Sequence, residues 1–117
     1  MADDLLAAKI AVLQRAFVVQ LPERIRALDD ALAKLGQDEE SVKAVHVIVH
    51  SLAGAGATFG CPEVSTAARE MEQAMFPSGI GHSKFDLAVH ARLPALVAAL
   101  KAAAERAVAE DPQSGQP

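Results

Sequence analysis

Residues 10–35 read IAVLQRAFVVQLPERIRALDDALAKL, and their large apolar side chains recur in steps of three and four. This spacing places them on one face of an α-helix, since a helix completes a turn in about 3.6 residues. Pro22 interrupts the stretch, which therefore forms either one long kinked helix or two helices with Pro22 in the first turn of the second. Gly36 suits the position just after a helix end. The expected inward side chains are Ile10, Leu13, Phe17, Leu21, Ile25, Leu28, Leu32 and Leu35.

The rest of the chain repeats the helical spacing three more times. A second helix is expected from near Asp38 to Phe59, and a third begins at Pro62, which is suited to a first helical position. Ser83 followed by Asp86 resembles a capping box that opens a last helix. The remaining inward positions are Val42, Val45, Val49, Leu52, Gly56 and Phe59, then Val64, Ala67, Ala68, Met71 and Met75, then Phe85, Val89, Leu93, Leu96, Leu100 and Ala107.

Composition supports an all-helical fold. The 117 residues (12.2 kDa) include 25 alanines and 4 Phe but no Trp and no Tyr. Alanine is the best helix former, whereas strands favour aromatic and β-branched residues, so a sandwich or barrel is disfavoured. We therefore expect an all-α, up-down four-helix bundle over residues 1–110. At the start of this range, residues 3–8 are candidates for a separate short helix. The polar tail at residues 111–117 is expected to be disordered.

Charge and cysteine content narrow the partners and the compartment. The net charge of −4 argues against nucleic acid as a partner, because a surface that follows phosphates needs a basic excess. The single cysteine, Cys61, cannot form an internal disulfide, so a reducing cytoplasm is the simplest location. No apolar run approaches 18 residues and the first residues are acidic, so we expect neither a membrane span nor a signal peptide.

His50 lies on the exposed side of the expected second helix. At about 100° per residue, it points roughly 130° away from the centre of the buried seam. The positions around it are small or apolar, where an ordinary exposed face would carry Glu, Lys and Gln. Such a surface around one exposed imidazole is typical of a docking surface with a reactive centre. Its expected residues are Val47, Ala53, Gly54 and Ala57, with Lys43 and His46 as supporting residues.

Two glycines lie inside this helix, where each costs about 1 kcal/mol relative to alanine. Gly56 lies on the buried seam and would allow close helix–helix packing. Gly54 lies on the side of His50, where it would let the backbone of another protein approach the imidazole. The alternative interpretation is an exposed histidine without a role.

Residues 50–60 read HSLAGAGATFG and resemble the signature of histidine-containing phosphotransfer (HPt) domains. That signature is His, any residue, a bulky apolar residue, usually Lys, Gly, and a second Gly six residues further on after an apolar residue. Ala53 stands where the family usually has Lys. The resemblance extends over roughly residues 4–109, including the Glu-Met-Glu at residues 70–72. The matching positions are Leu52, Gly54, Phe59 and Gly60.

The resemblance implies that His50 accepts and donates a phosphoryl group through an imidazole nitrogen. It implies a response-regulator receiver domain as partner, including the receiver of a hybrid histidine kinase, whose aspartate and bound Mg²⁺ perform the transfer. The chain itself would bind no cofactor and would act as a monomeric phosphocarrier rather than as an enzyme. Phosphoryl transfer needs in-line positioning and charge neutralisation more than side-chain chemistry, which fits a chain without a Gly-rich phosphate loop.

Two alternatives use the same helix. A non-phosphorylated helical adaptor would bind a receiver or a kinase through the surface around His50. A metal-binding bundle would use His46 and His50, which are spaced i, i+4. However, Val47 stands where the metalloprotease helix has Glu, and no third ligand is evident from the sequence. We therefore assign no metal ligands at this point.

The remaining polar residues are interpreted as structural. Cys61 fits a small packing residue better than a reactive thiol. His82 fits a loop or a cap, and His90 fits ordinary helix surface. Arg24, like the other arginines, is scattered singly and fits a solvated face or a surface pair. Glu72 and its neighbours give no paired-carboxylate site for acid–base chemistry.

Overall fold

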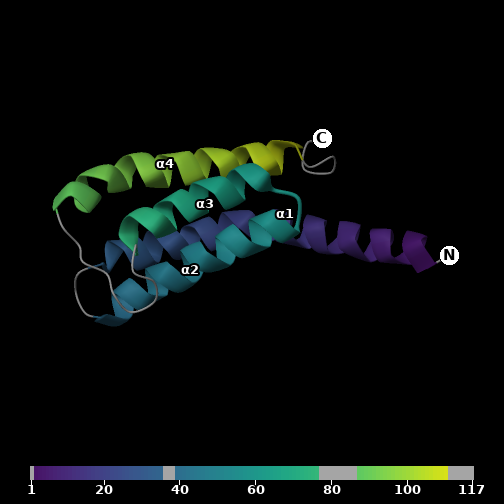
Figure 1. Ribbon diagram of the computed structural model, residues 1–117, viewed down its shortest axis with the longest axis horizontal. Helices are drawn as coiled ribbons and strands as arrows, with labels where there is room; N and C mark the ends of the chain where they lie inside the picture. The colour runs from purple at the N-terminus through teal and green to yellow at the C-terminus, as the bar shows by residue number, and fades with distance from the viewer. Residues whose placement is uncertain (1, 36–38, 77–86, 111–117) are drawn as a thin grey trace.

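The computed structural model describes residues 2–35, 39–76 and 87–110. Over these residues it contains four helices and no strand: α1 (Ala2–Ala33), α2 (Glu39–Thr58), α3 (Pro62–Met75) and α4 (Leu87–Glu110). Successive helices run in opposite directions (Figure 1). α1 packs against α2 and α4, and α3 packs against the same two helices, so the four helices enclose one core. This confirms the up-down four-helix bundle.

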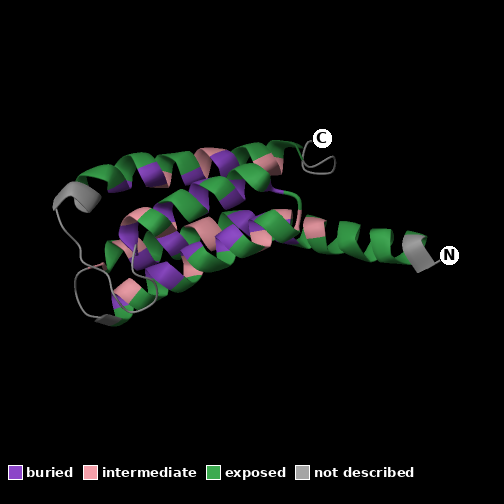
Figure 2. Cartoon of the chain, viewed as in Figure 1, coloured by how far each residue is buried: buried purple, intermediate pink, exposed green. Residues whose placement is uncertain are grey.

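The first helix is a single continuous element. Residues 3–8 belong to α1, so the expectation of a separate short N-terminal helix is wrong, and Pro22 lies inside α1 without dividing it. The first part of α1 extends beyond the other helices (Figures 1 and 2). Ile10 and Leu13 are therefore 40% and 52% exposed, although the periodicity predicts them to point inward. The stripe is buried only from Phe17 onward, where α2 and α4 are present to cover it.

α1 also contains a stretch that passes the length and hydropathy test for a membrane span, Asp4–Ala33. The expectation from the sequence that no stretch is long and apolar enough to span a membrane is therefore wrong. The core helix of a soluble protein passes the same test. Such a core helix is mostly buried, whereas 11% of the apolar window of this stretch is buried, including Phe17, Leu21 and Leu28 (at most 3% exposed).

The three later helices follow the predicted pattern. α3 begins at Pro62, and its five predicted inward residues are all buried. On α2, the seam is buried at its centre and half-buried at its two ends. On α4, Leu93, Leu96 and Leu100 are buried and Ala107 is half-buried. The predicted capping box from Ser83, the side chain of Val89 and the tail at residues 111–117 lie outside the described residues.

The turn between α2 and α3 holds these two helices close together. Gly60 has a φ of +76°, a left-handed conformation that glycine adopts without a Cβ penalty. Ser65, in the first turns of α3, donates a hydrogen bond from Oγ to the backbone carbonyl of Ala53 on α2 at 2.7 Å. Gly56 is buried beside the same part of α3. Small residues therefore line the α2–α3 contact and allow the backbones of the two helices to lie close together.

Candidate functional site

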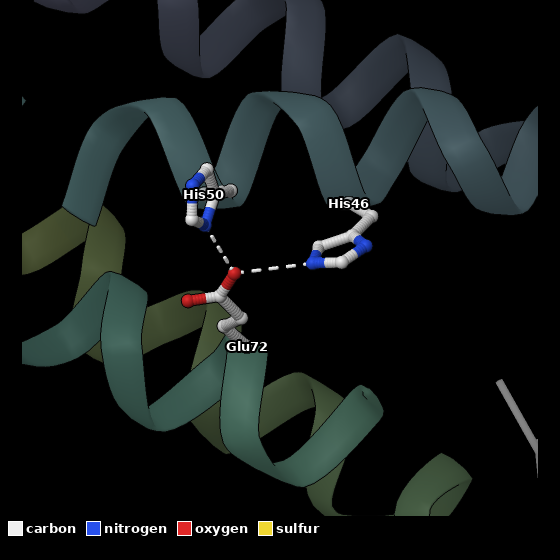
Figure 3. Close-up of side chains that lie close together, drawn as sticks. All are labelled: His46, His50 and Glu72. Atoms are coloured by element: carbon white, nitrogen blue, oxygen red, sulfur yellow. Dashed lines mark hydrogen bonds and ion pairs between the residues drawn. The ribbon is translucent and has the colours of Figure 1, made fainter. Parts of the chain in front are cut away.

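His50 is exposed on α2 and is held from one side by α3. Its side chain is 68% exposed, and its Nδ1 lies 2.6 Å from Oε2 of Glu72. Glu72 belongs to α3, and its side chain is only 20% exposed. The second ring nitrogen of His50, Nε2, lies on the side away from Glu72 (Figure 3). In the His50 ring, Nδ1 is therefore held by Glu72, while Nε2 faces outward.

His46 lies one turn before His50 and reaches the same carboxylate oxygen. Its Nε2 is 3.1 Å from Oε2 of Glu72 (Figure 3). The ring of His46 stacks on that of Phe76, with centroids 4.2 Å apart and planes 15° from parallel. His46 is 6% exposed, so it lies within the core rather than at its boundary. Packing and the hydrogen bond together fix the orientation of this ring.

The charge of Glu72 decides where the protons of the two histidines lie. Burial raises the pKa of this carboxyl, but hydrogen bonds from His50 and His46 and their charges outweigh the burial, so the pKa is lowered below its ordinary value. Glu72 is therefore ionised at neutral pH. An ionised carboxylate can only accept hydrogen bonds, so Nδ1 of His50 and Nε2 of His46 must donate. In its neutral form, His50 then carries its lone pair on the outward Nε2.

The predicted docking surface is mostly exposed. Val47 is 68% exposed, and Lys43 and Ala57 are also exposed. A Cβ added to Gly54 would meet nothing within 4 Å, so this glycine is not required by packing within the described chain. The surface of α2 formed by Lys43, Val47, His50, Gly54 and Ala57 is called the His50 face below.

Ala53 does not belong to the His50 face, and its prediction as a contact residue is wrong. It is 4% exposed. Three residues after His50, the helix has turned by about 300°, which directs position 53 toward α3 rather than outward. The hydrogen bond from Ser65 to its carbonyl shows how closely α3 approaches there.

Glu72 is the main site residue that the sequence reasoning missed. A signal was present: Glu72 lies four residues after Ala68 and three before Met75, both inward positions of α3. A carboxylate among inward positions needs a hydrogen-bonding partner, because burying an unpaired charge is costly. Periodicity could have identified Glu72 as a candidate, but only the bundle shows that its partners are His46 and His50.

An arginine of α1 contacts the residue that follows His50 in α2. Nη1 of Arg24, on α1, donates a hydrogen bond to Oγ of Ser51 at 3.4 Å, and Ser51 directly follows His50. The guanidinium carbon lies 5.3 Å from the centroid of the Phe17 ring, which holds it against α1. Lys43, expected from the sequence as a supporting residue, is two turns away from His50 along α2. Arg24 thus places a positive charge at Ser51, whose side chain points about 100° away from that of His50 around α2.

Cys61 is buried, at 8% exposed, as predicted for a packing residue. Although it directly precedes α3, burial and, to a smaller extent, the charge of Glu110 raise the pKa of its thiol. A raised pKa disfavours the reactive thiolate, which agrees with a structural role. His82 lies outside the described residues, and the side chain of His90 is not described.

The same three residues could hold a metal ion. Over the described residues, one ligand atom each from His46, His50 and Glu72 lies within 4.8 Å of the others. The sequence showed no third ligand for the histidine pair, and the structure supplies one from another helix. The metal-binding alternative is therefore better supported than the sequence indicates.

Comparison with known families agrees with the motif. Residues 12–107 match the Hpt domain family, which confirms the resemblance seen in residues 50–60. The match includes α2, α3 and most of α1 and α4, together with the residues His46, His50 and Glu72. Comparisons with curated proteins and with solved structures found no match. Hpt domains serve histidine phosphotransfer in phosphorelays, where they act as phosphocarriers and interact with receiver domains. Because the match covers most of its 117 residues, the chain belongs to the Hpt domain family.

Proposed function

We propose that His50 accepts a phosphoryl group on Nε2 from one receiver domain and donates it to another. The observation that carries this proposal is the 2.6 Å hydrogen bond from Nδ1 of His50 to Glu72 in a side chain that is otherwise 68% exposed. This bond assigns the proton to Nδ1 and leaves the lone pair on the nitrogen that a partner can reach. Among the described side chains, His46 shares the carboxylate but is buried and cannot take this role.

The transfer step uses few groups of this chain. The Nε2 lone pair attacks the phosphorus of an aspartyl phosphate, the N–P bond forms, and the P–O bond to the aspartate breaks. The imidazole keeps its Nδ1 proton and gains positive charge, which the Glu72 carboxylate stabilises at close range. Charge on the phosphoryl oxygens is neutralised by Mg²⁺, which we propose the receiver supplies. Glu72 is therefore a positioning and charge-stabilising residue, and His50 is the nucleophile.

The His50 face supplies the contact surface for the receiver. Val47 offers an exposed apolar side chain, and the open space at Gly54 admits a partner close to the imidazole. Because the chain provides a nucleophile and a surface, we propose that it acts as a monomeric, cytoplasmic phosphocarrier without a resident cofactor. Its partners would be receiver domains, including that of a hybrid histidine kinase, rather than nucleic acid or membrane.

The deciding experiment is transfer of labelled phosphate from a phosphorylated receiver. The wild-type chain should acquire one acid-labile, alkali-stable label, and His50→Gln should acquire none. His82→Gln serves as a matched control and should be labelled like the wild type. If the wild type binds receivers but takes no label from any receiver of its host, the phosphocarrier proposal is wrong and the adaptor alternative holds.

A further inference from the structure

We infer that His46, His50 and Glu72 form a binding site for one zinc ion, and that zinc and a phosphoryl group exclude each other on His50. The binding site is argued from the three side chains alone. The exclusion rests on the proposed function, because it concerns the nitrogen that carries the phosphoryl group.

The ligand atoms are close to the arrangement that zinc requires. Oε2 of Glu72 lies 3.1 Å from Nε2 of His46 and 2.6 Å from Nδ1 of His50, and all three atoms lie within 4.8 Å of one another. Tetrahedral zinc, with bonds of about 2.0–2.1 Å, separates its ligand atoms by roughly 3.3 Å. Both ring nitrogens point at Oε2, so the ion would take nearly the position of this oxygen, and the Glu72 carboxylate has to move back by about the length of a zinc–oxygen bond, roughly 2 Å, to become the third ligand.

The chemistry of the three ligands favours zinc over the common hard cations. Two imidazoles and one carboxylate form a known ligand set of zinc sites that keep a fourth position for water. Magnesium and calcium prefer sites made of oxygen atoms. The exposed side of His50 leaves room for the water, while Glu72 contributes the negative charge.

Two of the three ligands are already held in place. His46 is 6% exposed and is stacked on Phe76, and Glu72 is 20% exposed and bonded to both histidines. Ordering these side chains on ion binding therefore costs little conformational entropy. The pair His46 and His50 comes from one face of α2, and Glu72 comes from α3, so the ion would also link the two helices.

Exclusion follows from the single lone pair of a neutral imidazole. When zinc binds Nδ1 of His50, the ring proton lies on Nε2, and that nitrogen can no longer attack phosphorus. Conversely, a phosphorylated His50 is protonated on Nδ1, and zinc can bind this nitrogen only after displacing that proton, so phosphorylation opposes zinc binding. The metal-free state, with its proton held on Nδ1 by Glu72, is the state competent for transfer.

Binding is tested by titrating the metal-free chain with ZnCl₂ in a calorimeter and with CoCl₂ in a visible spectrometer. We expect one ion per chain and the absorption of tetrahedral cobalt. Glu72→Gln and His46→Phe should each lower the affinity at least about 10-fold. Gln keeps an acceptor for His50, and Phe keeps the stacking on Phe76, so both variants should remain folded by circular dichroism.

Matched controls separate this site from other ligands in the chain. Glu70→Gln changes an exposed carboxylate on the same helix, and the double replacement His82→Ala/His90→Ala removes the other two histidines. Both should bind zinc like the wild type. Wild-type affinity in Glu72→Gln, or loss of binding only in the His82/His90 variant, would overturn the assignment.

Exclusion is tested by adding one equivalent of zinc before transfer from a phosphorylated receiver. The wild type should lose labelling, whereas His46→Phe, which keeps His50, should be labelled equally with and without zinc. Equal inhibition of both would mean that zinc acts on the receiver, and the exclusion would be wrong. Absence of labelling without zinc would instead contradict the proposed function, and the titrations would stand unaffected.

Discussion

Gly54 and Gly56 lie two residues apart in α2 but are glycines for opposite reasons. A Cβ added at Gly56 would lie 2.9 Å from the backbone nitrogen of Ser65 and 3.1 Å from the carbonyl oxygen of Cys61, whereas a Cβ added at Gly54 would meet nothing within 4 Å. Gly56 is therefore required by the packing of α2 on α3. Gly54 is not required by any described contact, as expected if its role is to admit the proposed partner.

The two glycines should respond oppositely to substitution by alanine. Gly54→Ala should raise the free energy of unfolding by about 0.5–1 kcal/mol, because alanine is the better helix former and no contact is strained. Gly56→Ala should lower it by about 1–3 kcal/mol, because the backbone of α3 has to move. Urea unfolding followed by circular dichroism measures both. A stability loss in Gly54→Ala would show that a contact occupies this space.

A longer side chain at position 54 should separate stability from function. Gly54→Gln should fold normally but lower kcat/KM for transfer from a receiver by up to about 100-fold, since displacing the reacting groups by about 1 Å has an effect of this size. Thr58→Gln, one turn further on the exposed side, is the matched control and should reduce transfer less. Equal transfer by Gly54→Gln and the wild type would argue against the His50 face as the docking surface.

Removing the carboxylate of Glu72 should change the tautomer of His50. In Glu72→Ala, the proton is no longer held on Nδ1, so part of the neutral imidazole should carry it on Nε2 and the transfer rate should fall on the order of 10-fold. The ¹⁵N chemical shifts of the His50 ring report the tautomer directly. Glu72→Gln should restore most of the Nδ1–H form. If Glu72→Ala slows transfer while the His50 nitrogen shifts stay unchanged, Glu72 acts only through stability.

Arg24 should stabilise negative charge on a phosphorylated His50 only weakly, because its guanidinium bonds to Ser51, whose side chain points about 100° away from that of His50 around α2. We expect Arg24→Gln to shorten the lifetime of the phosphohistidine by up to about five-fold, as for an exposed charge pair. Arg26→Gln is the control, because Arg26 pairs with Glu23 at 2.6 Å on the same helix. The measurement is the decay of labelled chain after removal of the receiver, and equal decay of both variants would exclude a specific effect of Arg24.

Cys61 should make the bundle less stable in alkali. Burial, and secondarily Glu110, raises the pKa of its thiol, so the folded chain keeps a proton that the unfolded chain loses above about pH 8.5. The stabilisation is complete below that pH and is lost as the pH rises toward the folded pKa. Urea unfolding between about pH 7 and pH 10 should show a falling free energy in the wild type and a smaller fall in Cys61→Ala. Identical slopes would contradict the prediction.

Much of the fold could be predicted because burial in a bundle follows helical periodicity. The start of α3 at Pro62 and its buried apolar residues were identified from spacing and from residue type, whereas the buried Ser65 was not. Ile10 and Leu13 fit the same period but are exposed, because periodicity specifies a face and not the presence of a neighbouring helix. The sequence of residues 2–16 by itself does not show that the other helices stop short of this part of α1.

The site was predictable only in part, for a similar reason. His50 could be found because exposure and the small residues beside it are properties of one helix. The contact of Glu72 with His46 and His50 spans 22 to 26 residues of sequence and depends on how α3 is rotated against α2. Ala53 was predicted to be exposed because it lies near the boundary between the exposed and packed sides of α2. At this boundary, the direction in which α3 crosses α2 decides whether a residue is buried.

The small residues between α2 and α3 have a consequence for the dimensions of the site. Interaxial distances in helix pairs vary from about 8 to 10 Å with the size of the side chains at the contact. Gly56, Ala53 and Ser65 are small and let α2 and α3 approach closely at this contact, where His46 and His50 bond directly to Glu72. Larger residues at these positions would separate the helices and break the bond to Glu72 without altering any of the three polar residues. Three small residues, one on α3 and two on α2, therefore set how far the His50 imidazole has to reach to its carboxylate partner.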